Sequence, residues 1–450
     1  MRLLALLLGW FLLPCGLYTR SAYASEQVLF QFTTAISTSA ENFGALIGDS
    51  GAGSTEVLRS CIASSGGTFS SLRVVAATAP QNGVGTQQYT VTLYIDGSAT
   101  SLSLVLSEDE VVDQDLVNTA SITAGQTYSL STTPSGTPIA PGTLTASVQF
   151  DGSTAAESLV CGSTSANVNQ SAAAARFIGL YGGQDTPDAT ESRYSMPWPT
   201  SGTFKNLRVT IEGDPDNGAG TQEYAYVLMV DGSPSALTTT ISDGETTDTD
   251  LVNTVAVTAG QLVDLRVTPA NTPVALEVRG IGLTFLADTD GEFVIPMTSF
   301  NDLSGTAARY LRMDGSGLNA TETEEDQVVA VAFTMKGFYL HLDGTPGAGN
   351  SYQFDLRQNT GAGAGDTAIT ETMSDVEVTE NFFTDVTINA ADLLDTESTP
   401  SSNPSARTVK IAYLGFIDQG GAAQQQYYLM SQEERCAPYG WWPRACWPRS

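Results

Sequence analysis

The chain has 450 residues and a formal net charge of −30, because 49 acidic side chains outnumber 19 basic ones. Such a surface repels phosphate backbones and anionic lipid, so nucleic acid is excluded as an expected partner. After the amino-terminal segment, no apolar run approaches the roughly 20 residues that cross a bilayer, so we expect no direct membrane insertion.

Residues 1–24 have the pattern of a secretory signal peptide. Arg2 precedes an apolar run that begins at Leu3, and the run is followed by Ala22-Tyr23-Ala24, which resembles an A-x-A cleavage site. A lipid anchor on Cys15 is the alternative, although the Leu-Pro pair before this cysteine fits it poorly. We therefore expect a secreted protein, extracellular or at the cell surface.

The cysteines that follow the predicted signal peptide could form two disulfides in an oxidising compartment. The favoured pair is Cys436 with Cys446, which closes a short loop, and Cys61 with Cys161 is the second candidate. Neither pair has the spacing of a zinc site.

Internal repeats dominate the mature chain. The stretch PQNGVGTQQYTVTLYIDG, which begins at Pro80, returns at Pro215 as PDNGAGTQEYAYVLMVDG. Residues 67–138 align without a gap to residues 202–273 at an offset of 135 (202 − 67), and about half of the positions are identical. A diverged third copy keeps the order of the landmarks, including Tyr352 after a Gly-rich turn. The chain therefore contains three copies of one unit.

The pattern within each unit predicts the fold class. Tyr89, Val91, Leu93 and Ile95 alternate with mostly polar residues, as in a half-buried antiparallel strand. Such runs, separated by Asp-Gly, Gly-rich and Thr-Pro turns, predict an all-β protein of three tandem antiparallel β-sandwich domains, jelly-roll-like. We place them at residues 25–153, 154–288 and 289–420, followed by a tail at residues 421–450.

One strand of the second unit differs from its counterparts. Its outward positions are apolar, namely Ala225, Val227 and Met229, whereas those of the first unit are mostly Thr. A strand that is apolar on both faces needs a cover, either from a neighbouring unit or from another subunit. We interpret these three residues as a candidate interface, with a locally thicker core as the alternative.

The order of the motifs resembles that of one known family. The strand YTVTLYIDG ends at Asp96-Gly97 and is followed by the turn Ala124-Gly125-Gln126; the second unit repeats both at Asp231-Gly232 and Ala259-Gly260-Gln261. This order resembles the C1q/TNF-like jelly-roll modules of bacterial surface and phage structural proteins, although Gln126 and Gln261 stand where Asp is usual. The resemblance implies trimeric assembly, and the tandem copies leave open whether the units pack on each other instead.

Catalytic residues are not predicted. The lone histidine, His341, lies in a predicted strand, and no sequence context resembles a nucleophile elbow, so we interpret it as structural and on the outer face. Two carboxylates suffice for glycoside hydrolysis, but this chain has so many that the signal is unspecific. A secreted carboxylate-dependent hydrolase is kept as an alternative.

The acidic runs SEDEVVDQD and SDGETTDTD are the candidate metal sites. The matching residues are Glu110, Asp113 and Asp115 in the first run and Glu245, Asp248 and Asp250 in the second. Oxygen ligands at a strand–loop junction could hold calcium, although the spacing departs from an EF-hand. Calcium is thus possible, and no other cofactor is expected.

The tail breaks with the preceding composition. It is mildly basic and carries Trp441, Trp442 and Trp447 around the predicted Cys436–Cys446 loop. Exposed tryptophan favours contacts with protein or glycan, and a mobile chain end is the alternative.

These observations favour a secreted, non-enzymatic structural or attachment protein at a cell or particle surface. Its expected partners are other copies of the chain, a surface partner or a glycan. A carbohydrate-binding adhesin that uses Trp198 or the tail tryptophans is the alternative from a different class.

Overall fold

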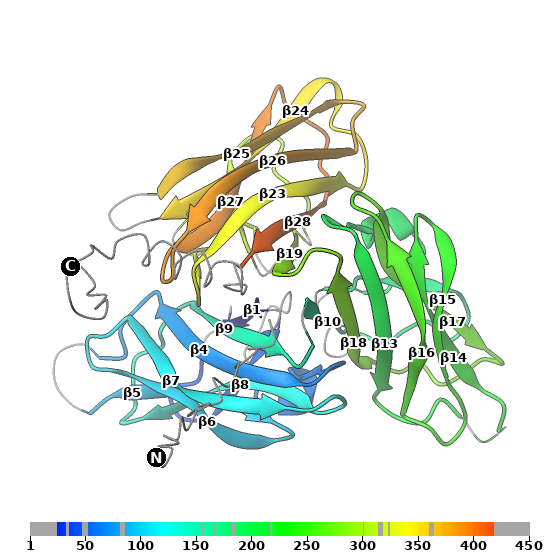
Figure 1. Ribbon diagram of the computed structural model, residues 1–450, viewed down its shortest axis with the longest axis horizontal. Helices are drawn as coiled ribbons and strands as arrows, with labels where there is room; N and C mark the ends of the chain where they lie inside the picture. The colour runs from blue at the N-terminus through cyan, green and yellow to red at the C-terminus, as the bar shows by residue number, and fades with distance from the viewer. Residues whose placement is uncertain are drawn as a thin grey trace, which may run out of the picture. The chain divides into compact units, whose positions relative to one another are not determined.

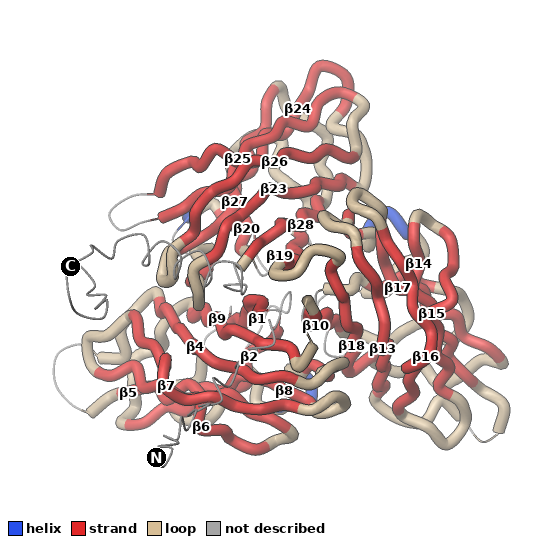
Figure 2. The backbone as a smooth tube through the Cα atoms, in the orientation of Figure 1, coloured by secondary structure: helices blue, strands red, loops and turns tan. Residues whose placement is uncertain are grey.

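The computed structural model describes residues 25–32, 36–46, 53–81, 86–154, 156–164, 168–181, 186–216, 218, 220–299, 301–313, 318–322, 325–359 and 364–417. Within these ranges the chain forms antiparallel strands and short 3₁₀ turns, such as η1 (Glu56–Leu58) and η2 (Glu191–Arg193), and no α-helix (Figure 2). The predicted all-β class is therefore confirmed. No helix in the described ranges has the length and apolar character needed to cross a bilayer.

The first β-sandwich consists of two layers of strands. One layer has the order β1-β9-β4-β7 and the other the order β2-β8-β5-β6, with β3 beside β8. Because β1 also pairs with β2, the two layers join into one nine-stranded sheet. The strands are β1 (Ser25–Phe32), β2 (Asn42–Leu46), β3 (Cys61–Ile62), β4 (Gly67–Ala76), β5 (Gln88–Ile95), β6 (Ser98–Ser107), β7 (Val112–Ile122), β8 (Thr127–Ser135) and β9 (Leu144–Gly152).

The second β-sandwich repeats this order. Its layers are β10-β18-β13-β16 and β11-β17-β14-β15, with β12 beside β17. The strands are β10 (Glu157–Gly162), β11 (Arg176–Ile178), β12 (Met196–Pro197), β13 (Gly202–Ile211), β14 (Glu223–Val230), β15 (Ser233–Ile241), β16 (Thr247–Val257), β17 (Leu262–Ala270) and β18 (Val278–Ala287).

The third β-sandwich has the same order with one added strand. Its layers are β19-β28-β23-β26 and β21-β20-β27-β24-β25, with β22 beside β27. The strands are β19 (Glu292–Thr298), β20 (Arg309–Arg312), β21 (Leu318–Asn319), β22 (Gln327–Val328), β23 (Phe333–Leu342), β24 (Gly347–Asn359), β25 (Ala364–Asp375), β26 (Thr379–Ile388), β27 (Leu393–Ser401) and β28 (Val409–Phe416). The strand order of all three sandwiches is that of a jelly roll (Figure 1). The exact domain boundaries stay predictions.

The repeated tyrosine strand occupies the same place in each sandwich. Tyr89, Tyr224 and Tyr352 are fully buried, and their hydroxyls donate to the backbone carbonyls of Ile139, Val274 and Ser405 at 3.2, 2.8 and 3.0 Å. A buried hydroxyl needs such a partner, so the repeat preserves an aromatic core side chain together with its acceptor. The alternation predicted for β5 is confirmed, because Val91, Leu93 and Ile95 are buried with Tyr89.

The three core clusters exchange side chains between sandwiches. Leu159 and Cys161 of the second sandwich belong to the core of the first. Val294 and Ala412 of the third belong to the core of the second. Leu29 of the first belongs to the core of the third. Each sandwich therefore completes the core of another, in cyclic order.

The short strands β3, β12 and β22 make the same cycle visible. β3 of the first sandwich contacts β18 of the second, β12 of the second contacts β28 of the third, and β22 of the third contacts β9 of the first. Since β9, β18 and β28 hold the same place in their sheets, the three contacts are equivalent. Equivalent head-to-tail contacts that close after three steps give the arrangement of a cyclic trimer, here within one chain.

Candidate functional site

The junctions between the sandwiches are the candidate functional site, because the repeats meet there. At the first junction a disulfide joins Cys61 in β3 to Cys161 in β10, with their Cα atoms 5.9 Å apart. The second candidate pair from the sequence is thus confirmed. Cys436 and Cys446 lie outside the described residues.

The third junction closes the cycle through backbone groups. The Gln327 side chain donates from Nε2 to the carbonyl of Ala146 at 2.9 Å. The backbone N–H of Ala330 donates to Oε1 of Gln27 at 3.0 Å, and the carbonyl of Ala330 accepts from Nε of Arg73 at 2.8 Å. These bonds fix the short β22 segment against the first sandwich.

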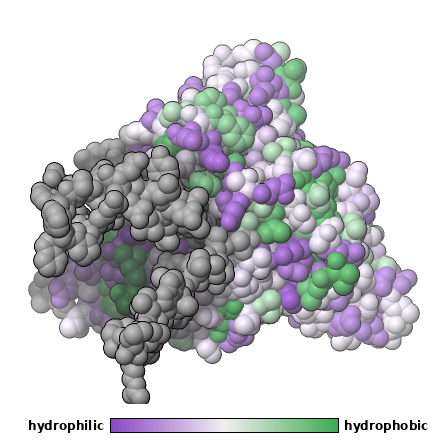
Figure 3. All heavy atoms as spheres, in the orientation of Figure 1, coloured by the Kyte–Doolittle hydropathy of each residue, from purple (hydrophilic) through white to green (hydrophobic). Residues whose placement is uncertain are grey.

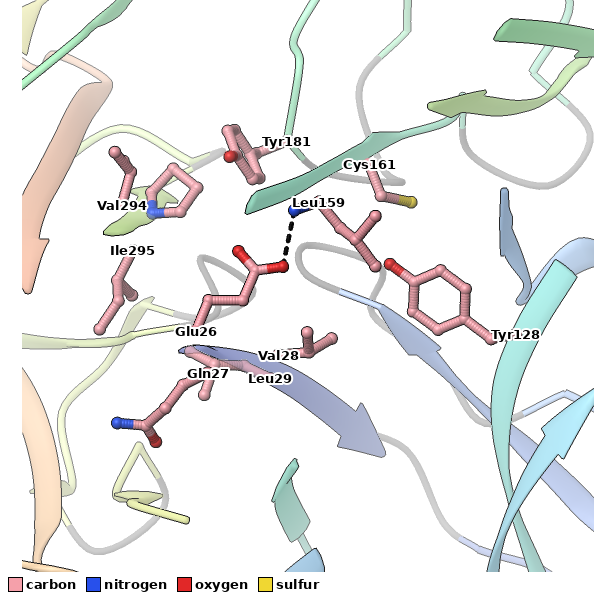
Figure 4. A pocket seen from close by; sticks show the side chains of 11 residues that line it. Glu26, Gln27, Val28, Leu29, Tyr128, Leu159, Cys161, Tyr181, Val294 and Ile295 are labelled. Carbon is pink, nitrogen blue, oxygen red and sulfur yellow. Dashed lines mark hydrogen bonds between the residues drawn. The ribbon is translucent and has the colours of Figure 1, made fainter. Parts of the chain in front are cut away.

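A buried carboxyl group lies where the first and second sandwiches meet. Glu26 in β1 is 3% exposed and accepts a hydrogen bond from the backbone N–H of Leu159 in β10 at 2.6 Å (Figure 4). It lines a cavity with Tyr128 and Tyr181, to which Val294 of the third sandwich also contributes. The cavity has a volume of about 10 Å³, enough for one water molecule and not for an organic ligand.

Burial controls the charge of this carboxyl group. The loss of water raises the pKa of Glu26 to about 8, against the opposing effect of the hydrogen bond from Leu159. Glu26 is therefore a neutral acid at neutral pH. Its hydrogen bond then joins two sandwiches without the cost of an uncompensated buried charge.

A second set of carboxyl groups recurs in all three sandwiches. Ser129 Oγ donates to Oε1 of Glu56 at 2.8 Å in the first sandwich. At the same offset of 135 (191 − 56 and 264 − 129), the second sandwich has Glu191 and Asp264. Burial, reinforced by the charge of Glu191, raises the pKa of Asp264 to about 8, although Ser195 Oγ donates to it at 2.8 Å. One carboxyl group in the first copy has thus become two in the second.

The third sandwich has still more carboxyl groups at the same place. Glu322 and Asp395 follow Glu191 and Asp264 at an offset of 131 (322 − 191 and 395 − 264). Burial and the neighbouring carboxyl group of Asp326 raise the pKa of Asp395. Asp326 directly precedes β22, so this group adjoins the junction strand. The sequence reasoning missed these residues, although the repeat offset that aligned the copies would also have aligned the carboxyl groups.

The acidic runs predicted as calcium sites lie along edge strands. In the first sandwich, Asp115, Asp113 and Glu110 accept hydrogen bonds from the backbone N–H groups of Ser103, Val105 and Ser107 at 3.1, 3.2 and 3.0 Å. In the second sandwich, Asp250, Asp248 and Glu245 do the same for Thr238, Thr240 and Ser242 at 3.1, 3.0 and 3.0 Å. Within the described residues, no group of three acidic, histidine or cysteine side chains is arranged to hold a metal ion. These carboxylates accept hydrogen bonds from backbone N–H groups of the neighbouring strand, and calcium binding stays a prediction.

Comparisons with known proteins give no family. No family model matches the chain, and no curated protein matches it. One solved structure that is similar over 92% of this chain and 85% of its own chain comes from the IBDV viral particle, with 8% sequence identity and a TM-score of 0.13. A TM-score this low carries no argument about function. The resemblance to C1q/TNF-like modules therefore stays a prediction beyond the jelly-roll strand order itself.

The candidate interface of the second sandwich is only partly accessible. Ala225 and Val227 are half-buried on the outward face of β14, whereas Met229 is 2% exposed. Burial of Met229 agrees with the alternative of a locally thicker core at that position. An interface at Ala225 and Val227 stays a prediction.

Two other residues from the sequence are buried. His341 alternates with the core residues Leu340 and Leu342, so it lies on the outer face of β23 as predicted. It is nevertheless only 5% exposed, because the second sandwich covers this face near Ser192. Its Nδ1 lies 3.3 Å from Thr379 Oγ1, and burial lowers its pKa to about 4. Trp198 is fully buried against Tyr181 and Phe204, so a glycan cannot stack on it and this part of the adhesin hypothesis is wrong. The tail residues Trp441, Trp442 and Trp447 lie outside the described residues.

Proposed function

We propose that the protein is a secreted, non-enzymatic structural or attachment protein at a cell or particle surface. The observation that carries this proposal is the cyclic set of equivalent junctions, in which β3, β12 and β22 each contact the next sandwich. Three jelly rolls that elsewhere would have to meet as separate subunits are held in one chain, and their association does not depend on concentration.

The nature of the junctions supports a structural role. They bury aliphatic side chains such as Leu29, Leu159 and Val294 and use a disulfide between the first two sandwiches. Disulfides are typical of oxidising compartments, which agrees with export of the chain. Hydrogen bonds also join the sandwiches, some to backbone groups such as the N–H of Leu159 and others between side chains such as Thr284 and Ser64. Such buried junctions are expected of a rigid building block rather than of hinged domains.

The mass of residues 25–450 in solution, measured by light scattering with calcium and with chelator, tests this proposal. Because the three junctions are already satisfied within one chain, we expect a stable assembly of several chains that uses other surfaces. A monomer that is indifferent to metal would contradict the structural role, and turnover of any substrate in a panel of polysaccharides and esters would contradict the non-enzymatic one.

A further inference from the structure

The first two sandwiches protect one edge of their sheets with carboxylates. The six carboxylates described above accept from alternate N–H groups of β6 and β15, which are the last strands of their layers. An edge strand with free N–H groups is a template for pairing with another chain. We call this row of acceptors the carboxylate ladder.

The corresponding edge of the third sandwich is β25. The ladder keeps its first member there, because Glu377 accepts from the backbone N–H of Ser374 at 2.6 Å. The next N–H group, that of Thr372, donates to the side chain of its own neighbour Glu371 at 2.8 Å instead of to a residue of β26. The ladder is thus reduced to one cross-strand member plus one local contact.

The remaining position has lost its acceptor. In the second sandwich Asp250 pairs with Leu207. Phe338 follows Leu207 at an offset of 131 (338 − 207), and in the third sandwich it pairs with Phe382. Phe382 therefore stands where the first two sandwiches have the aspartate that caps the innermost N–H group. That N–H group belongs to Thr370 in β25, and no side chain in the described part of the chain accepts a hydrogen bond from it.

Two exposed apolar side chains lie next to this edge. Val376 and Val378, in the turn between β25 and β26, are 78% and 37% exposed. Phe383 in β26 is 44% exposed, but it packs on Tyr339 on the outer face of its sheet, away from β25. Apolar surface over β25 and β26 is visible in the upper part of Figure 3. Exposed apolar side chains beside a strand edge are typical of a binding surface.

The charge around β25 selects the partner. Glu371, Glu377 and Glu380 lie together at this edge, and burial and the charges of Glu377 and Glu371 raise the pKa of Glu380. A second copy of β25 would bring the same carboxylates and add repulsion. A basic segment would neutralise them.

We propose that β25 binds an extended, Lys- or Arg-containing segment of another protein by strand addition. Backbone pairing begins at Thr370, the basic side chains contact the glutamates, and apolar side chains of the segment pack on Val376 and Val378. This surface would supply the proposed attachment protein with a partner, and the inference rests on that proposal for its biological setting.

The probe is a labelled peptide of about ten residues that alternates Lys and Val, the length of a typical strand. Fluorescence anisotropy with the whole chain measures its binding against two matched peptides, one with Glu in place of Lys and one with alternate backbone amides N-methylated. We expect the Lys peptide to bind about tenfold more tightly than either control, because each control removes one component of recognition. Equal binding of the N-methylated peptide would indicate charge attraction alone and would overturn the proposal.

Two variants test the edge itself. Thr370→Pro removes the open N–H group at an edge position where proline is tolerated. Phe382→Asp restores the acceptor that the first two sandwiches have. We expect about a tenfold loss of peptide binding in each. The matched control is Thr238→Pro in β15, whose N–H group Asp250 already occupies, and it should bind as the unaltered chain does.

The two variants test the same edge independently, so one can replace the other. If Thr370→Pro fails to fold, as judged by its melting curve, Phe382→Asp still decides the question. Unchanged binding in a folded variant would overturn the proposal. The light-scattering mass is read separately, so a failure at β25 is distinguishable from a failure of the structural role.

Discussion

Gln126 donates from Nε2 to Oδ2 of Asp96 at 2.7 Å, and Gln261 makes the same bond to Asp231 at 2.8 Å. The amide oxygen of Gln126 meanwhile accepts from the backbone N–H of Thr123 at 2.8 Å. One glutamine therefore ties the Asp-Gly turn to the Thr-Ala-Gly-Gln turn. This explains why both turns recur together in the sequence.

Replacement of Gln126 tests this tie. Gln126→Ala loses three hydrogen bonds at an exposed site, two from Thr123 and one to Asp96, and we expect the free energy of unfolding to fall by about 1 kcal/mol. Gln126→Glu keeps the acceptor for Thr123 but faces the Asp96 carboxylate, so its loss at neutral pH should shrink in acid, where carboxylates are protonated. Urea denaturation of both variants at neutral and acidic pH measures the difference. An equal loss for Gln126→Glu at both pH values would show that the contact with Asp96 has no energetic role.

Removal of the disulfide should loosen the first junction. Cys61 and Cys161 are 100 positions apart, so their bond restricts a long loop of the unfolded chain. We expect Cys61→Ala with Cys161→Ala to lower the free energy of unfolding by about 2–4 kcal/mol. Denaturant curves with and without reductant check this. The double variant should respond little to reductant, whereas a large further loss would assign the stabilisation to other cysteines.

The stability of the chain should depend on pH through Glu26. Its folded pKa is raised from 4.5 to about 8, so the contribution is complete below pH 4.5 and is lost as the pH rises towards 8. Glu26→Gln keeps a neutral acceptor for Leu159 at every pH. We expect this variant to match the unaltered chain near pH 4.5 and to exceed it at pH 8, by on the order of a few kcal/mol. Melting curves across this range measure the effect, and parallel pH profiles of the two proteins would rule out ionisation of Glu26.

Variants of Trp198 distinguish a role in the hydrophobic core from a role in glycan binding. Trp198→Ala removes a fully buried side chain and should cost about 3–5 kcal/mol of stability. Trp198→Phe keeps most of the ring contacts and should cost less. If the protein is retained on a glycan array, we expect folded Trp198→Phe to be retained equally. Selective loss of retention in this folded variant would return Trp198 to the adhesin hypothesis.

Much of the fold could be predicted because its signals are local. The alternation from Tyr89 to Ile95 and the Asp96-Gly97 turn each depend on a few neighbouring residues, and Asp96 and Gly97 have the left-handed φ values of 48° and 71° that such a turn requires. The junctions could not be predicted in this way. Glu26 meets Leu159 across more than a hundred positions, and nothing in its neighbourhood indicates that water is excluded from it.

The hydrogen-bond partners of the carboxylates at the sheet edges also could not be predicted from the sequence. The spacing of Asp113 and Asp115 indicated oxygen ligands, which was chemically sound, but the donors that they meet are the N–H groups of Val105 and Ser103. Which donor a carboxylate meets depends on the register of β6 against β7 across the sandwich, and that register is a property of the folded layers. The missing aspartate of the ladder at β25 becomes visible only when Phe382 is placed by its pairing with Phe338.

The cyclic exchange of core side chains also means that residues of one core are synthesised at very different times. Leu29 is made at the beginning of the described chain but belongs to a core whose other members, such as Phe293 and Tyr413, are made last. An apolar side chain of the first jelly roll must therefore wait in water until the third is complete. A truncated translation product would keep that surface exposed, which gives a chaperone or a protease of the exporting cell a physical mark of incomplete chains.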